Sequence, residues 1–125
     1  IDLGGQATGD KLTLGNFLNT LTVSNAETVA GGSSTDLVTL GQAEAGGFYD
    51  LGAGTDRLVF NADGATVTVA NIETITGSAA ADKVTVSGTV TAAIINLGAG
   101  ADSVTLNGAS SGVTLQGVET VTGST

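Results

Sequence analysis

A glycine-rich turn that ends in aspartate and leads into alternating apolar residues recurs along this chain. The clearest copies are "YDLGAGTDRLVF" at Tyr49–Phe60 and "INLGAGADSVTL" at Ile95–Leu106, and "IDLGGQATGDKLTL" at Ile1–Leu14 is a longer one. Recurrence of this kind indicates stacked units, none of which can bury its apolar side alone. The recurring turn therefore limits the possible folds more than any other feature of the sequence.

The copies divide residues 1–125, a single repeat segment, into units at 1–48 and 49–94 and an incomplete unit at 95–125. A second landmark reads "AETVAGG", "IETITGS" and "VETVTGS", and another aspartate follows its first two copies. Aspartates thus fall at positions 10, 36, 56, 82 and 102, in alternating steps of 26 and 20 residues. This spacing predicts coils that average 23 residues, with every aspartate turn on one edge.

The residues that follow each aspartate alternate between apolar and polar, which is the pattern of half-buried strands. Val and Thr are abundant and favour strands, while twenty Gly and no Pro indicate tight turns. We therefore predict an all-β fold, a parallel β-solenoid of about five coils. The residues expected in its core are Leu12, Leu14, Val38, Leu40, Leu58, Phe60, Val84, Val86, Val104 and Leu106.

The composition excludes several classes of function. A net charge of −9 disfavours nucleic acid as a partner. The chain has no Cys and no His, so disulfides, thiol and imidazole chemistry and the common zinc sites are absent. No apolar run is long enough to insert into a membrane. We expect no enzymatic activity, and because both ends interrupt a repeat we expect the native chain to continue in both directions.

If the five turns align, their aspartates form a column with a spacing of about 4.8 Å between coils. Stacked carboxylates repel one another, and each basic residue of the chain, Lys11, Arg57 and Lys83, directly follows an aspartate of the column. We expect these basic residues to offset part of the repulsion at the exposed edge.

The turns "GAGTD" and "GAGAD" resemble the calcium-binding nonapeptide G-G-x-G-x-D-x-U-x of repeats-in-toxin proteins. The β-rolls of that family carry two nine-residue repeats per coil. The resemblance implies calcium held by turn carbonyls and aspartates, at Gly52, Gly54, Asp56, Gly98, Gly100 and Asp102 first, then at Asp10, with Asp36 and Asp82 completing the column. The alternative is that the aspartates cap backbone groups without a metal.

The pattern as a whole, best seen in "NIETITGSAAADKVTV" at Asn71–Val86, is similar to repeat regions of bacterial surface-layer proteins and of giant adhesins secreted by type I systems. The resemblance implies an extracellular location at the bacterial cell surface and a structural role, as a surface-layer subunit, an adhesin stalk or a filament. It also implies calcium-dependent folding and self-association through stacked coils, end to end or laterally. A metal-independent polymerising scaffold is the alternative.

Two further recurrences carry separate hypotheses. Glu27, Glu73 and Glu119 occur once per unit, and we expect each to have a structural role at a corner, turned outward or aimed at a neighbouring backbone N–H, rather than to bind a metal. Threonine rows on a flat face suit ice or glycan binding, although Thr is also a common exposed strand residue. The expected rows are Thr22, Thr68 and Thr114, and Thr28, Thr74 and Thr120.

Overall fold

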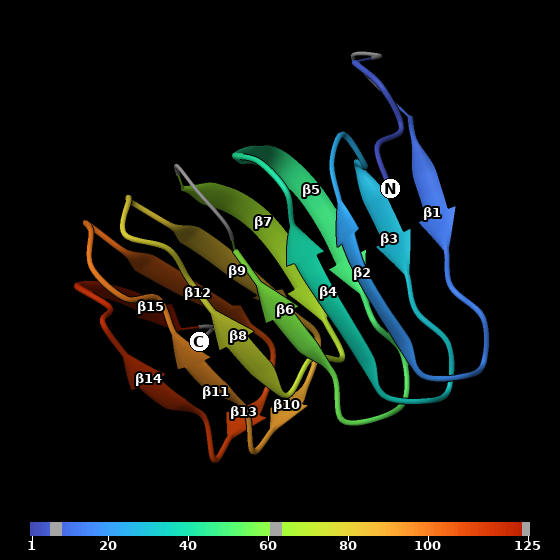
Figure 1. Ribbon diagram of the computed structural model, residues 1–125. Helices are drawn as coiled ribbons and strands as arrows, with labels where there is room; N and C mark the ends of the chain where they lie inside the picture. Colours follow the sequence, from blue (N-terminus) through green and yellow to red (C-terminus); the bar gives the residue numbers. More distant parts are fainter. Residues whose placement is uncertain (6–8, 61–63, 124–125) are drawn as a thin grey trace.

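The computed structural model describes residues 1–5, 9–60 and 64–123, and each regular element within them is a β-strand. Two parallel sheets face each other and the chain winds between them (Figure 1). The predicted class, an all-β parallel solenoid, is confirmed. Within the described residues, no helix is long and apolar enough to cross a bilayer.

The larger sheet has seven strands and the smaller has six, and consecutive strands of the chain alternate between them. In stacking order the larger sheet contains β1 (Lys11–Thr13), β3 (Thr28–Ala30), β5 (Glu44–Asp50), β7 (Ala65–Ala70), β9 (Lys83–Ser87), β12 (Ser103–Asn107) and β15 (Thr120–Gly123). The smaller contains β2 (Asn19–Val23), β4 (Asp36–Leu40), β6 (Arg57–Val59), β8 (Thr74–Thr76), β11 (Ile94–Asn96) and β14 (Thr114–Gln116). A short third ladder pairs β10 (Val90–Thr91) with β13 (Ser110–Ser111).

The coils are shorter than the expected 23 residues. In the larger sheet Leu12 pairs with Val29 and Val29 with Tyr49, steps of 17 and 20 residues. In the smaller sheet Val38 pairs with Leu58 and Leu58 with Ile75, steps of 20 and 17. The expected length was wrong because it assumed that the sequence repeat spans two whole coils.

The repeat spans two and a half coils instead. Tyr49 lies two coils after Leu12 in the larger sheet, and Leu58, the sequence equivalent of Leu12, lies half a coil further on, in the smaller sheet. The next equivalent, Val104, is back in the larger sheet. Equivalent residues therefore change sheets with each repeat, and a half-coil of about nine residues is the true structural unit.

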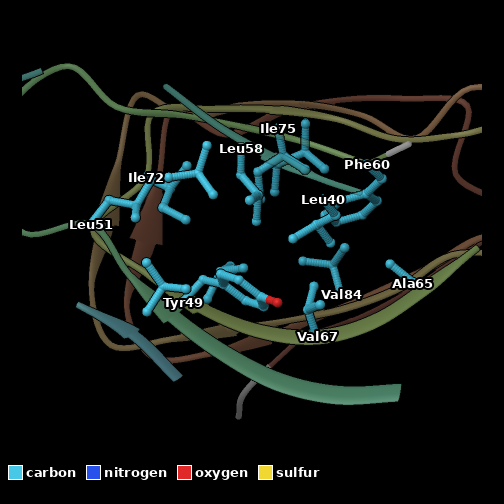
Figure 2. Close-up of a cluster of buried hydrophobic side chains, with 14 of the residues drawn as sticks. Leu40, Tyr49, Leu51, Leu58, Phe60, Ala65, Val67, Ile72, Ile75 and Val84 are labelled. Atoms are coloured by element: carbon cyan, nitrogen blue, oxygen red, sulfur yellow. The ribbon is translucent and has the colours of Figure 1, made fainter. Parts of the chain in front are cut away.

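Alternation along the strands fills the space between the sheets with aliphatic side chains (Figure 2). Of the ten predicted core residues, seven are buried, and Leu12, Leu14 and Leu106 are partly buried against the same cluster. Tyr49 is fully buried among them, and its hydroxyl donates a hydrogen bond to the carbonyl of Ala26 (3.2 Å). Burying a large aliphatic side chain contributes about 1.5–3 kcal/mol, so the core drives the stacking.

The close approach of successive turns generates a test of the stacking. A Cβ atom added to Gly31 would lie 2.1 Å from the carbonyl oxygen of Leu51 in the next coil, whereas one added to Gly123 would meet nothing within 4 Å. We expect Gly31→Ala to destabilise the protein by about 1–3 kcal/mol, as overpacking does. Gly123→Ala should change stability little. Urea unfolding of both variants decides, and equal stabilities would contradict this packing of the turns.

Candidate functional site: the acidic stacks

The predicted single column of aspartates is wrong, because the aspartates divide between the two edges of the solenoid. Asp36 and Asp56 lie where the chain passes from the larger sheet to the smaller, which we call the forward edge. Asp10, Asp82 and Asp102 lie where it passes from the smaller sheet to the larger, the return edge. The half-coil shift of the repeat causes this division, since it moves each equivalent aspartate to the other edge.

On the forward edge the acidic side chains form a directional stack, in which each carboxylate accepts from the backbone of the preceding coil. The N–H of Asn19 donates to Asp36 Oδ1 (3.2 Å), and the N–H of Asp36 to Asp56 Oδ1 (2.7 Å). The N–H of Asp56 donates in turn to Glu73 Oε2 (2.7 Å). Asn19, Asp36, Asp56 and Glu73 are the forward stack.

On the return edge the same arrangement recurs 46 residues later. The N–H of Ala65 donates to Asp82 Oδ1 (2.8 Å), and the N–H of Asp82 to Asp102 Oδ1 (2.7 Å). The N–H of Asp102 donates to Glu119 Oε2 (2.7 Å). Ala65, Asp82, Asp102 and Glu119 are the return stack. A separate pair continues the pattern nearer the N-terminus, where the N–H of Asp10 donates to Glu27 Oε2 (2.9 Å).

These bonds continue the hydrogen bonding between successive coils at the points where the strands begin. The carbonyl of Asp56 accepts from the N–H of Thr74 in the next coil (3.0 Å), while its N–H is satisfied by Glu73 of that same coil. An unpaired buried N–H costs about as much as a lost hydrogen bond, so the side chain supplies an acceptor where the turn offers no carbonyl. Of the two orientations expected for the recurring glutamates, the structure shows the one aimed at a neighbouring backbone N–H.

The aspartates are more deeply buried than a surface column would be. Asp36, Asp56, Asp82 and Asp102 are each at most 1% exposed. Alternation places Arg57 outward, and its guanidinium donates to the hydroxyl of Thr76 (3.3 Å). Lys11 and Lys83 are exposed as well. The basic residues therefore point away from the buried carboxylates. The prediction that they stand beside exposed aspartates along one edge was wrong, because the aspartates are buried.

The aspartates fall into two classes by their second carboxylate oxygen. Oδ2 of Asp36 accepts from the N–H of Gly32 (3.4 Å), and Oδ2 of Asp82 accepts from the N–H of Ser78 (2.8 Å). Oδ2 of the three aspartates that end the glycine-rich turns is enclosed and has no hydrogen-bond partner; these are Asp10, Asp56 and Asp102. The residues that most resemble the calcium nonapeptide are therefore those with an unpaired oxygen.

The environment of Asp56 raises the pKa of its carboxyl. Burial raises the pKa of the Asp56 carboxyl most, and the Glu73 and Asp36 carboxylates raise this pKa further, against a lowering by the N–H of Asp36. Two carboxylates that flank a third in a medium of low dielectric disfavour a third negative charge. Burial likewise raises the pKa of Glu44, near the hydroxyl of Tyr49.

The glycines of the resembling turns serve close packing. A Cβ on Gly54 would lie 2.8 Å from Asp56 Oδ1 and 2.9 Å from the carbonyl oxygen of Ser34. A Cβ on Gly100 would meet the carbonyl oxygen of Ala80 (2.6 Å) and Asp102 Oδ1 (2.8 Å). A Cβ on Gly52 would lie still closer to the carbonyl oxygen of Gly32 in the preceding coil. A Cβ on Gly98 would lie as close to that of Ser78. The turns need glycine because backbone packs against backbone.

In this conformation the carboxylates alone do not make up the shell of a calcium ion, which takes about 6–8 oxygens at about 2.3–2.6 Å. Among the described residues, no group of three or more Asp, Glu, His or Cys side chains could hold a metal. Oδ1 of Asp56 and of Asp102 is already occupied by an N–H donor, and their Oδ2 atoms are enclosed. Calcium at the nine predicted positions thus stays a prediction of the resemblance.

The predicted threonine rows are also divided between the sheets. Thr22 and Thr114 lie in the smaller sheet and Thr68 lies in the larger. The register instead aligns Thr68, Thr85, Thr105 and Thr122 on neighbouring strands of the larger sheet. This row ends at Phe48, which pairs with Thr68. The face available to ice or a glycan is therefore four threonines long.

Comparisons with protein-family models, with curated proteins and with solved structures give no match to this chain. Its function is therefore argued from the fold and the acidic stacks.

The hydrogen bond between Asp56 and Glu73 offers a direct test of the forward stack. Glu73→Ala leaves the buried N–H of Asp56 without an acceptor, and we expect a loss of about 1–3 kcal/mol in unfolding free energy. Glu73→Gln keeps an amide oxygen and should lose less. Glu119→Ala removes the same bond to the equally buried Asp102 in the return stack and should lose a similar amount. Urea unfolding measures all three, and a Glu73→Ala protein as stable as wild type would contradict the capping role.

Proposed function

We propose that this chain is a structural repeat segment of a large secreted bacterial surface protein, such as a surface layer, an adhesin stalk or an extracellular filament. The observation that carries the proposal is the continuous parallel pairing of both sheets from β1 to β15 and from β2 to β14. Each coil pairs with its neighbours in both sheets, which suits a stack that transmits force and spacing along its axis. The proposal assigns no catalysis to the chain.

The coil length supports the resemblance from which this proposal starts. Steps of 17 and 20 residues lie close to the two nine-residue repeats per coil of repeats-in-toxin β-rolls. The buried faces are almost wholly aliphatic, while the outward positions of β7, β9 and β12 are mostly polar, with Thr, Ser, Lys and Asn and one Ala. This division suits a segment whose role is to hold shape in water.

Surface location is the part of the proposal that a cell experiment tests. Antibodies raised against the folded segment should label intact cells of the source organism, and external protease should remove the label. An antibody against a cytoplasmic protein controls for lysis. Labelling that requires permeabilised cells would contradict the proposed location.

The edge strands favour a second candidate, a scaffold that polymerises end to end. β1 and β15 each have one neighbour in the larger sheet, and parallel edges of this kind can pair with another chain. Val121 of β15 pairs with the buried Val104 and is itself 52% exposed.

Light scattering after size-exclusion chromatography in chelator distinguishes the two candidates. If the chain polymerises through its ends, its mass rises with concentration, and Val121→Asp abolishes the rise. Ile94→Asp is the matched control, because Ile94 is 50% exposed on the outer side of the smaller sheet, away from the open ends. A constant monomer mass at all concentrations would rule out the scaffold and leave the structural segment.

A further inference from the structure

The hydrogen bonding along the forward edge changes partway along the solenoid. The forward stack ends at Glu73, and in the next coil a longer turn contains β10, which pairs with β13 in a short ladder of its own (Figure 1). A pocket of about 120 Å³ lies where the two kinds of turn meet. We call it the forward pocket, and the residues that line it are Asn71, Ile72, Glu73, Thr89, Val90 and Thr91.

The return edge contains an equivalent place 46 residues earlier, which serves as an internal comparison. Asn25 and Asn71 share a positive φ, and each donates its side-chain amide to an aspartate of the preceding coil. The carbonyls of Glu27 and Glu73 each accept an N–H from the following coil (2.8 and 2.9 Å). The backbones of the two places therefore correspond, and their side chains account for the difference between them.

Three side chains occupy this place on the return edge. The amide of Gln42 donates to Oδ1 of Asn25, and the hydroxyl of Tyr49 donates to the carbonyl of Ala26 (3.2 Å). Glu44 lies near the same hydroxyl. The counterparts of these three side chains on the forward edge carry no polar group, and they are Gly88, Val90 and Ile95.

The forward pocket therefore keeps the acceptors of the return edge without the donors that serve them. Nδ2 of Asn71 is committed to Asp50 (2.7 Å), which leaves its Oδ1 to correspond to the oxygen of Asn25 that Gln42 reaches. Glu73 adds a carboxylate, of which Oε2 also accepts the N–H of Asp56 (2.7 Å). A ligand that fits this pocket must donate hydrogen bonds.

The charge of the pocket selects the kind of donor. Among the described residues that line it Glu73 is acidic and none is basic, and the chain as a whole carries a net charge of −9. Hydrogen bonds between a cation and a carboxylate are about twice as strong as those between neutral groups. A positively charged N–H donor is therefore preferred over a neutral one.

We propose that the forward pocket binds an alkyl guanidinium or ammonium group, carried by an arginine or lysine side chain of a partner protein or by a free polyamine. The N–H groups donate to Oδ1 of Asn71 and to the carboxylate of Glu73, and the aliphatic stem lies against Ile72 and Val90. A single water needs about 10–15 Å³, so a pocket of about 120 Å³ admits such a head group.

Titration of the wild-type protein, followed by NMR of its backbone amides, tests the pocket without any substitution. The probes are the N-acetyl amides of arginine, of lysine and of citrulline, which keeps N–H donors but has no charge. We expect arginine or lysine amide to cause saturable shifts at Asn71, Glu73 and Thr91, and citrulline amide to bind about tenfold more weakly. The amides of Asn25 and Glu27 are the internal control and should not shift.

Two outcomes of this titration would overturn the proposal. Equal shifts at the forward pocket and at its counterpart would show only a general attraction of cations to an acidic protein. Citrulline amide that binds as tightly as arginine amide would show that the pocket selects donors and not charge. Spermidine distinguishes the two sources, because tighter binding of spermidine than of either basic amide supports the pocket and assigns it to a free polyamine.

Glu73→Gln removes the charge of the pocket and keeps an oxygen for the N–H of Asp56. We expect this variant to bind arginine or lysine amide about tenfold more weakly, since one charge-assisted hydrogen bond is lost. Glu27→Gln is the matched control on the return edge and should bind as wild type does, and circular dichroism checks that both variants fold. Unchanged binding by Glu73→Gln would contradict the proposal, and the wild-type titration decides if that variant does not fold.

The binding experiment and the surface labelling experiment are independent, because the pocket does not depend on where the protein is located. Failure of one leaves the other standing.

Discussion

A hydrogen bond from a backbone N–H to the carboxylate of the next coil ties together the edges of this solenoid. The bonds from Asp36 to Asp56 and from Asp56 to Glu73 are both 2.7 Å long, and the return edge repeats them. The sheets alone would leave these N–H groups unpaired where each turn enters a strand. The carboxylates continue the hydrogen bonding between coils through the turns. Successive coils are therefore bonded to each other at their edges as well as along their strands.

The same bond explains why the sequence carries its acids in a fixed order. Within a stack the chain places two aspartates and then a glutamate in successive coils, and the longer glutamate side chain reaches the last amide. Where the same turn offers a backbone N–H, the aspartate accepts hydrogen bonds with both carboxylate oxygens, as Asp36 and Asp82 do. Those in the "GAGxD" turns lack such a donor, and the unpaired Oδ2 follows.

Much of this architecture could be predicted from the sequence. Alternation after each aspartate identified the core residues correctly, because a buried strand face has a period of two. The corner role of Glu73 and its equivalents also followed from alternation. The coil length could not be predicted, nor could the edge of the solenoid on which each aspartate lies, because the turns on the two edges share one motif. Locally "GAGTD", which ends at Asp56, and "GAGAD", which ends at Asp102, give no sign of which sheet follows; only the strand register shows that the first leads into the smaller sheet and the second into the larger.

The two-and-a-half-coil period has a consequence for how such a segment can change in length. Loss or duplication of one unit of 46 residues would turn everything beyond it by half a revolution about the axis, since Leu12, Leu58 and Val104 occupy alternate sheets. Side chains such as those of the row from Thr68 to Thr122 would then face the opposite direction. Two units gained or lost together would restore the original direction. Lengthening by pairs of units would preserve what each face presents to its surroundings, and lengthening by single units would reverse it.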